Sequence, residues 1–124
     1  MKLKPKAFHN TFSNLLSSKL KPLVNHNLTL NLATCLEVYT KIFDTLAEII
    51  IEAQLPLSNE SMNYIAQQYY DGILINGTQE LDPEIFSPRA RLELIETKEL
   101  ALMAVMLNGT DFSLPILAEI KKRS

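Results

Sequence analysis

The feature that most constrains the fold is a long apolar repeat that predicts a helix over residues 29–54. Apolar side chains recur along it at alternating steps of four and three: Leu28, Leu32, Cys35, Tyr39, Ile42, Leu46, Ile49 and Ala53. These steps place side chains on one face of an α-helix. A second set widens that face beyond a coiled-coil seam: Leu36, Phe43, Ala47 and Ile50. We therefore expect this helix to be buried on more than one side of a bundle.

Proline and capping residues indicate two more helices around this one. Apolar periodicity predicts a helix over residues 7–20, which Pro22 and the Asn25-His26-Asn27 cluster end. Pro56 closes the 29–54 helix, and Ser58 has the side chain of a good N-cap for the next helix. Three helices are thus expected before residue 75.

A fourth principal helix is predicted over residues 88–107. Ser87-Pro88 is typical of a helix start, and Asn108-Gly109 of a helix end. The second half, Leu100–Leu107, is apolar all round. Since such a segment needs cover on every side, we expect it to be buried on all sides.

Two short helices complete the prediction, and one segment has two interpretations. One short helix is expected at residues 82–86, and a final one is expected to be capped by Ser113 or Asp111. Residues 72–81 form either a helix end or a hairpin around Asn-Gly. We favour the helix end because Thr78-Gln79-Glu80-Leu81 is a poor strand.

A short phrase occurs twice in the second half of the chain. Ile75-Asn76-Gly77-Thr78 returns as Leu107-Asn108-Gly109-Thr110, followed in both cases by a proline. It indicates either a helical repeat or two helices that end in the same way. The likeness fades upstream, which favours the second interpretation.

Composition fits a single helical domain over residues 1–124. The chain is 47% hydrophobic, has no Trp and has only three Gly, which disfavours a turn-rich β fold. We expect an all-α bundle of four principal and two short helices, built around the 29–54 and 88–107 helices. Residues 1–6 are expected to form a mobile basic tip.

Charge is strongly segregated along the chain. Five lysines and no acid precede Glu37. All fourteen acids lie between Glu37 and Glu119, and the chain ends with Lys121-Lys122-Arg123 and a serine. Asp44, Glu48 and Glu52 are like charges one turn apart on the 29–54 helix, and the last of them lie near its C-terminal end, where the helix dipole disfavours anions. A nearby cation would relieve this row.

Catalytic chemistry is missing from the sequence pattern. The only histidines are His9 and His26, and no metal-ligand, nucleophile or phosphate-loop motif is present. Glu93, Glu96 and Glu99 are spaced by three, but no histidine accompanies them, so we interpret them as a solvated face. We expect no enzyme activity, no cofactor, no metal site and no small-molecule substrate.

The surroundings of the protein are also constrained by sequence. Cys35 is the only cysteine, so it cannot form an intrachain disulfide and fits a reducing compartment. No secretory signal or membrane-length apolar segment is evident. We expect a cytoplasmic protein that does not bind membranes.

A protein-interaction module is the function that the sequence favours. Ample apolar helical surface and segregated charge predict a protein partner or self-association. The candidate partner-binding residues are Lys19, Lys21, Asp44, Glu48 and Glu52. The alternative is a nucleic-acid-associated regulator that uses the basic N-terminal segment.

Overall fold

A computed structural model describes residues 4–24, 32–74 and 89–124, and all regular structure in these ranges is helical. The all-α prediction is therefore confirmed. The elements are the 3₁₀ turns η1 (Pro5–Ala7) and η3 (Leu92–Leu94) and the helices α1 (Phe8–Val24), α2 (Leu32–Ala53), α3 (Asn59–Leu74), α4 (Thr97–Met106) and α5 (Ser113–Arg123).

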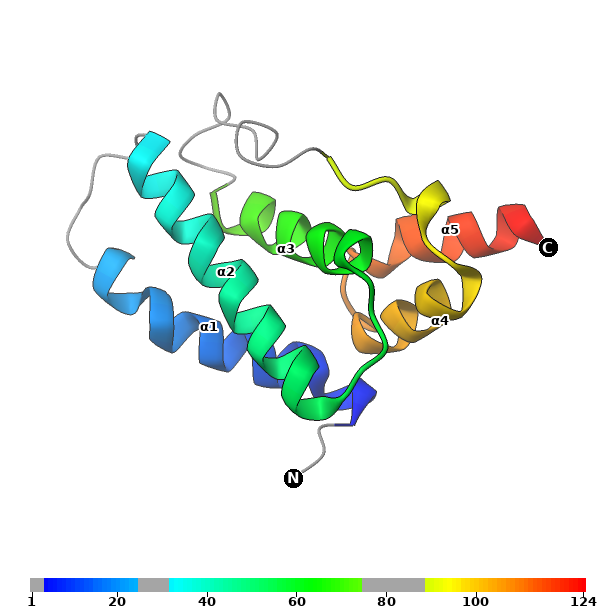
Figure 1. Cartoon of the computed structure of the whole chain (residues 1–124), viewed down its shortest axis with the longest axis horizontal. Coiled ribbons are helices and arrows are strands. Elements are labelled where there is room, and N and C mark those ends of the chain that lie inside the picture. The colour runs from blue at the N-terminus through cyan, green and yellow to red at the C-terminus, as the bar shows by residue number, and fades with distance from the viewer. Residues whose placement is uncertain (1–3, 25–31, 75–88) are drawn as a thin grey trace.

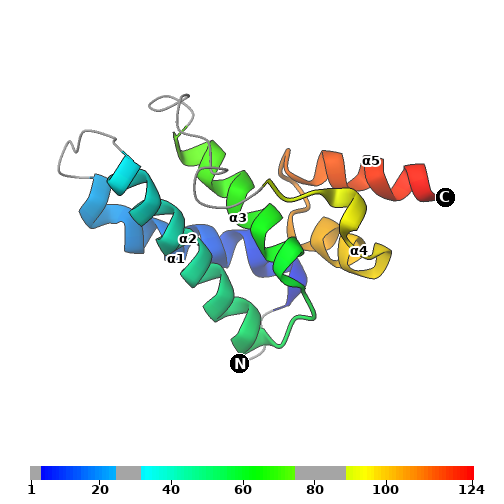
Figure 2. The ribbon, with the colours of Figure 1, turned by 45° about the horizontal axis from the view of Figure 1, so that its top comes forward.

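Helix α3 lies between two helical pairs. Helices α1 and α2 cross on one side of it, and the α4–α5 hairpin packs on the other (Figures 1 and 2). The turn η1, which includes Lys6 of the expected basic tip, packs against α4. The chain thus joins its two pairs through α3 and through its N-terminal turn.

Burial is more complete on α3 than on any other described helix. Between residues 61 and 70, only Asn63 and Gln68 are not buried. Tyr69 and Tyr70 are both buried, although they are neighbours in sequence. We expected the bundle to be built around the 29–54 and 88–107 helices. The 88–107 part of this expectation was wrong, because α3 is the helix with neighbours on both sides.

Most apolar side chains predicted to face the core from α1 and α2 are buried where side chains are described, but Leu36, which we expected on the widened face of the 29–54 helix, is 45% exposed. Phe8, Phe12, Leu16 and Leu20 are buried on α1. On α2 the buried seam residues are Tyr39, Ile42, Leu46, Ile49 and Ala53. Helix α1 continues to Val24, so Pro22 does not end it as expected. Proline at this point removes only one hydrogen bond, close to the end of the helix.

The junction between α2 and α3 is formed by two helix caps. Gln54 has φ 56°, and the Gln54 and Leu55 amides donate to the carbonyls of Ile51 and Ile50. This is a Schellman cap with glutamine where glycine is usual. Ser58 then caps α3 as predicted, since its Oγ accepts the Ser61 amide at 3.3 Å.

The helix predicted over residues 88–107 is not continuous. Described residues 89–96 form an extended segment containing η3, and α4 has only ten residues. The expectation that Leu100–Leu107 is buried on every side was also wrong. Leu100, Met103 and Met106 are buried, but Ala101 is exposed and Val105 is 40% exposed. Helix α4 packs on α5, η1 and α3, and these neighbours leave one of its sides exposed.

The end of α4 and the start of α5 share one turn. Gly109 has φ +88°, in agreement with the predicted helix stop. Neither Ser113 nor Asp111 caps α5 through its side chain as expected, because Phe112 is the N-cap. The Ser113 hydroxyl instead donates to the Thr110 carbonyl at 2.9 Å. The expected helix at 82–86 lies outside the described residues. Of the 72–81 segment with two interpretations, residues 72–74 belong to α3 and residues 75–81 lie outside the described residues.

Candidate functional site

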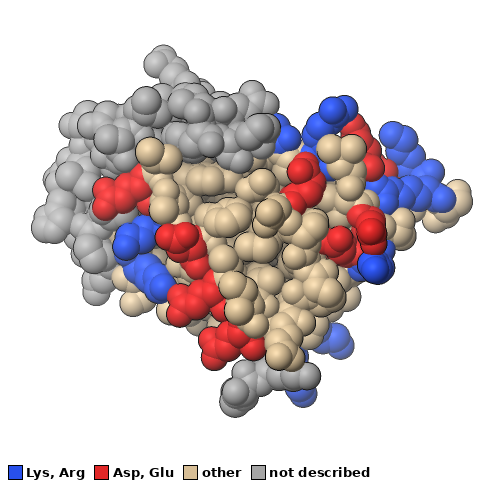
Figure 3. All heavy atoms as spheres, in the orientation of Figure 1, with Lys and Arg blue, Asp and Glu red and all other residues tan. Residues whose placement is uncertain are grey.

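The solvent-exposed side of α2 carries acidic and apolar side chains, which makes it a candidate binding face. We define the outer face of α2 by its exposed side chains, which are Leu36, Glu37, Thr40, Lys41, Asp44, Glu48, Ile51 and Glu52. Acidic side chains gather on this side of the molecule, at the left in Figure 3. Ile51 is 74% exposed and Leu36 is 45% exposed. The face therefore combines two uncovered apolar side chains with a net negative charge.

One of the candidate cations meets this face from inside the same chain. Lys19 Nζ on α1 lies 3.0 Å from Glu48 Oε2 on α2. Both side chains are more than one-third exposed, so water and salt screen this pair. Asp44 and Glu52 have no cation partner within the described part of the chain. The side chain of Lys21 lies outside the described set.

Residues 89–96, which we call the strap, are tied to α3 by side chains. The Ala90 amide donates to Gln67 Oε1 at 2.9 Å, and the Arg91 amide donates to Glu60 Oε1 at 2.8 Å. Gln67 is fully buried. These bonds give two backbone donors of the extended strap acceptors on α3.

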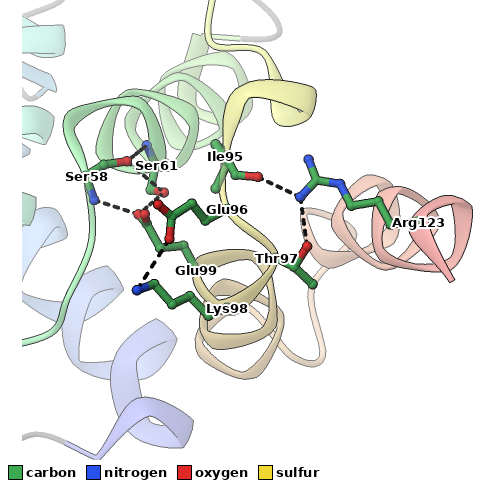
Figure 4. Close-up of polar contacts among 8 residues, drawn as sticks. All are labelled: Ser58, Ser61, Ile95, Glu96, Thr97, Lys98, Glu99 and Arg123. Carbon is green, nitrogen blue, oxygen red and sulfur yellow. Dashed lines mark hydrogen bonds and ion pairs between the residues drawn. The ribbon is translucent and has the colours of Figure 1, made fainter.

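Arg123, at the end of α5, holds the other end of the strap. Its guanidinium donates to the carbonyls of Ile95 at 2.7 Å and Leu92 at 3.0 Å, and to the Thr97 hydroxyl at 3.1 Å. Glu119 pairs with the same guanidinium at 3.0 Å. The right side of Figure 4 shows Arg123 reaching across to Ile95 and Thr97. Arg123 is therefore a structural clasp rather than a solvated tail residue.

Glu99 joins α4 to the start of α3. Its Oε1 accepts the Ser58 amide and the Ser61 hydroxyl, each at 2.7 Å (Figure 4). Burial alone would raise the pKa of Glu99, but these hydrogen bonds and the charge of Lys98 lower it, and the net shift is downward. The carboxylate also lies at the positive end of the α3 dipole. Glu99 was expected on a solvated face, and that interpretation was wrong.

An aromatic cluster fills the space between α1, α3 and the turn before α5. Tyr69 contacts Phe12 edge-on at 4.7 Å and Phe112 at 5.0 Å between ring centroids, and its hydroxyl is hydrogen-bonded to His9 Nδ1. Burial raises the pKa of Tyr69, and burial raises that of Tyr64 to about 12. Both phenols therefore stay protonated and act as packing groups with a polar end.

Neither a metal-ligand group nor a helix that could span a membrane occurs among the described residues. They contain no group of three or more His, Cys, Asp or Glu side chains placed to hold a metal ion. None of the described helices combines the length and the apolar character that a membrane span requires. What the described site can do is present an acidic, partly apolar helix face to another molecule.

Comparison adds no relative to this description. No protein-family model, no curated protein and no solved structure matches the chain. The functional argument therefore rests on the geometry above.

Sequence reasoning missed several residues that matter here. Ile51 lies outside the apolar seam and between acidic positions in the sequence. This placement could have indicated that its side chain is exposed. For Glu99 and Arg123 the sequence held no such signal, because their partners are backbone groups more than 25 residues away: Ser58 for Glu99, and Leu92 and Ile95 for Arg123.

Proposed function

We propose that this chain is a non-enzymatic protein-binding module and that the outer face of α2 binds the partner. The observation that supports the proposal is Ile51, which is 74% exposed beside Glu48 and Glu52. Protein interfaces typically have an apolar centre and a charged rim. A partner with an apolar side chain set among Lys or Arg residues would match this face.

Charge accounts for the choice of a basic partner. Asp44 and Glu52 have no cation partner among the described residues, and Glu52 lies in the last turn of α2. Anions at that end repel the negative pole of the helix dipole. A partner's cations would relieve this repulsion without breaking an ion pair within the chain.

A cytoplasmic location belongs to the same proposal. The single Cys35 favours it, because a chain that forms no internal disulfide gains nothing from an oxidising compartment. The Cys35 side chain is not among those described, so the support comes from the sequence alone.

The proposal can be tested by site-specific photo-crosslinking in the native host. A photoreactive amino acid at position 51 should give a discrete adduct with one partner protein. The same probe at Asn10, which is exposed on α1, is the matched control. We expect Asp44→Lys with Glu52→Lys to remove the adduct at position 51 while circular dichroism stays unchanged. An adduct pattern at position 51 that is the same as at position 10 would refute the proposal.

The nucleic-acid alternative has weaker support in the described residues. Lys19 is one of the five lysines of the basic N-terminal segment, and it is already paired with Glu48. Phosphate contacts release counterions, so a binder of this kind loses affinity steeply as salt increases. Duplex binding that weakens steeply between low and moderate salt would favour the alternative, and absence of binding at low salt would remove it.

A further inference from the structure

Helix α5 presents a second exposed surface, on the opposite side of the α4–α5 hairpin from its packed face. Ile116 is buried, and Ile120 and Glu119 are partly buried. The outward side has an exposed row at helical spacing, which we call the α5 row: Asp111, Leu114, Leu117, Ala118 and Lys121. Leu114 is 61% exposed and Leu117 is 50% exposed. Two leucines one turn apart form an apolar strip with no cover from the described chain.

The α5 row has opposite charges at its two ends. Asp111 precedes the helix but belongs to the same spiral, because Phe112 has helical angles (φ −64°, ψ −24°) and the Leu114 amide donates to the Asp111 carbonyl at 3.2 Å. Lys121 ends the row in the last turn of α5. The row is therefore acidic, then apolar, then basic along its length.

We infer that the α5 row is a self-association surface on which a second copy of this chain docks its own α5 in antiparallel orientation. In that arrangement a two-fold axis passes level with Ile116. Asp111 of each copy then meets Lys121 of the other copy, and the leucine strips face each other at the centre. Contacts of this isologous kind are the commonest in homo-oligomers.

The charge order selects a second copy over other occupants. A partner with uniformly acidic or uniformly basic character would be repelled at one end of the row. A parallel copy would place like charges together at both ends, which is unfavourable at close range. Only an occupant with the reversed charge order suits both ends, and an antiparallel second copy has that order by symmetry.

The expected dimer is weak, because the row is short. A single helix row of this length buries less than a standard interface, so a dissociation constant in roughly the micromolar range or above is expected. The dimer would leave the outer face of α2 uncovered. This inference therefore does not depend on the partner proposed for that face.

The test is a charge swap measured by sedimentation equilibrium. Wild type should show a concentration-dependent dimer, and Asp111→Lys or Lys121→Glu alone should remove it, since each places two like-charge pairs in the interface. Mixing the two variants should restore a dimer, because both contacts in the mixed pair are then between opposite charges. Each changed side chain is exposed, so both variants should keep the circular dichroism spectrum of the folded wild type.

Two controls make the result decisive. Asp44→Lys with Glu52→Lys on α2 should leave the dimer intact, and Leu117→Asp should abolish it. The inference is overturned if wild type stays monomeric at millimolar concentration, if the mixed variants fail to associate, or if the α2 changes abolish the dimer. If no dimer forms, the crosslink expected at position 51 is still expected. The two proposals can therefore fail independently of each other.

Discussion

Helices α3 and α4 pack against each other and bury very different side chains. Helix α3 buries a serine, a glutamine and three tyrosines among its apolar residues. Helix α4 consists largely of Leu, Ala, Met and Val, yet leaves Ala101 exposed and Val105 40% exposed. Position between neighbouring helices, rather than the polarity of the helix itself, determines how much of each is covered.

The buried polar groups of α3 are tolerated because each has a partner. Gln67 Oε1 accepts the Ala90 amide, Ser61 Oγ donates to Glu99, and the Tyr64 hydroxyl donates to the Phe112 carbonyl at 3.3 Å. A buried polar group without a partner is costly, whereas a partnered one is close to neutral. These bonds also connect α3 to the strap, to α4 and to the turn before α5, so they place the second helical pair.

The largest expected effect is a difference in unfolding free energy between a variant in the core of α3 and a variant at an exposed position of α4. Ile65→Ala should lower the free energy of unfolding by about 2–5 kcal/mol, because Ile65 is fully buried and truncation leaves a cavity. Val105→Ala should lower it by less than about 0.5 kcal/mol, since much of its surface already meets water. Urea denaturation of both variants measures the difference. Equal losses would show that α4 is covered in solution, for example by self-association, and the measurement should be repeated at low concentration.

The next effect tests whether the polar groups of α3 support the fold. Gln67→Leu keeps the side-chain size but leaves the Ala90 amide without its acceptor, so we expect a loss of about 1–3 kcal/mol. Hydrogen exchange at the Ala90 amide should accelerate in the same variant. Gln68→Leu, next in sequence and only partly buried, is the control and should change little. A variant at position 67 that is as stable as wild type would show that the strap is held by other contacts.

Local patterns were sufficient to predict much of the fold. The seam on α2 was predicted correctly because its spacing matches the helix period. The helix start at Ser58 and the helix stop at Gly109 were predictable because each depends only on neighbouring backbone groups. The predicted helix over 88–107 failed because its first half exchanges helical hydrogen bonds for bonds to Gln67, Glu60 and Arg123. Such partners are distant in sequence, and propensity cannot indicate them.

The candidate site was predictable only in part. The acidic row on α2 follows from spacing, since Asp44, Glu48 and Glu52 must share a face of any helix. That Lys19 lies beside Glu48 depends on how α1 crosses α2, which one sequence does not specify. The exposed leucines of α5 were missed because a short apolar helix looks the same in sequence whether its outer side is covered or not.

The smallest effect tests the contact through which α4 meets the start of α3. At neutral pH, Glu99→Ala should cost about 0.5–2 kcal/mol, the range of a lost helix cap, and Glu99→Gln should cost less because its amide oxygen can still accept the Ser58 amide. The pKa of Glu99 is lower in the folded chain than its ordinary value of 4.5. The negative charge of Glu99 therefore stabilises the fold when the pH is above this ordinary pKa. The contribution is lost as the pH falls through the lower pKa of the folded state.

Denaturation midpoints of wild type and Glu99→Gln should thus converge as the pH is lowered from 6 to about 3. Glu96→Gln is the matched control, because Glu96 belongs to the same row of acids but meets only the exposed Lys98, at 3.4 Å. Its difference from wild type should stay small over the whole range. If the difference in denaturation midpoint between wild type and Glu99→Gln does not change with pH, then the negative charge of Glu99 adds nothing to the α3–α4 contact.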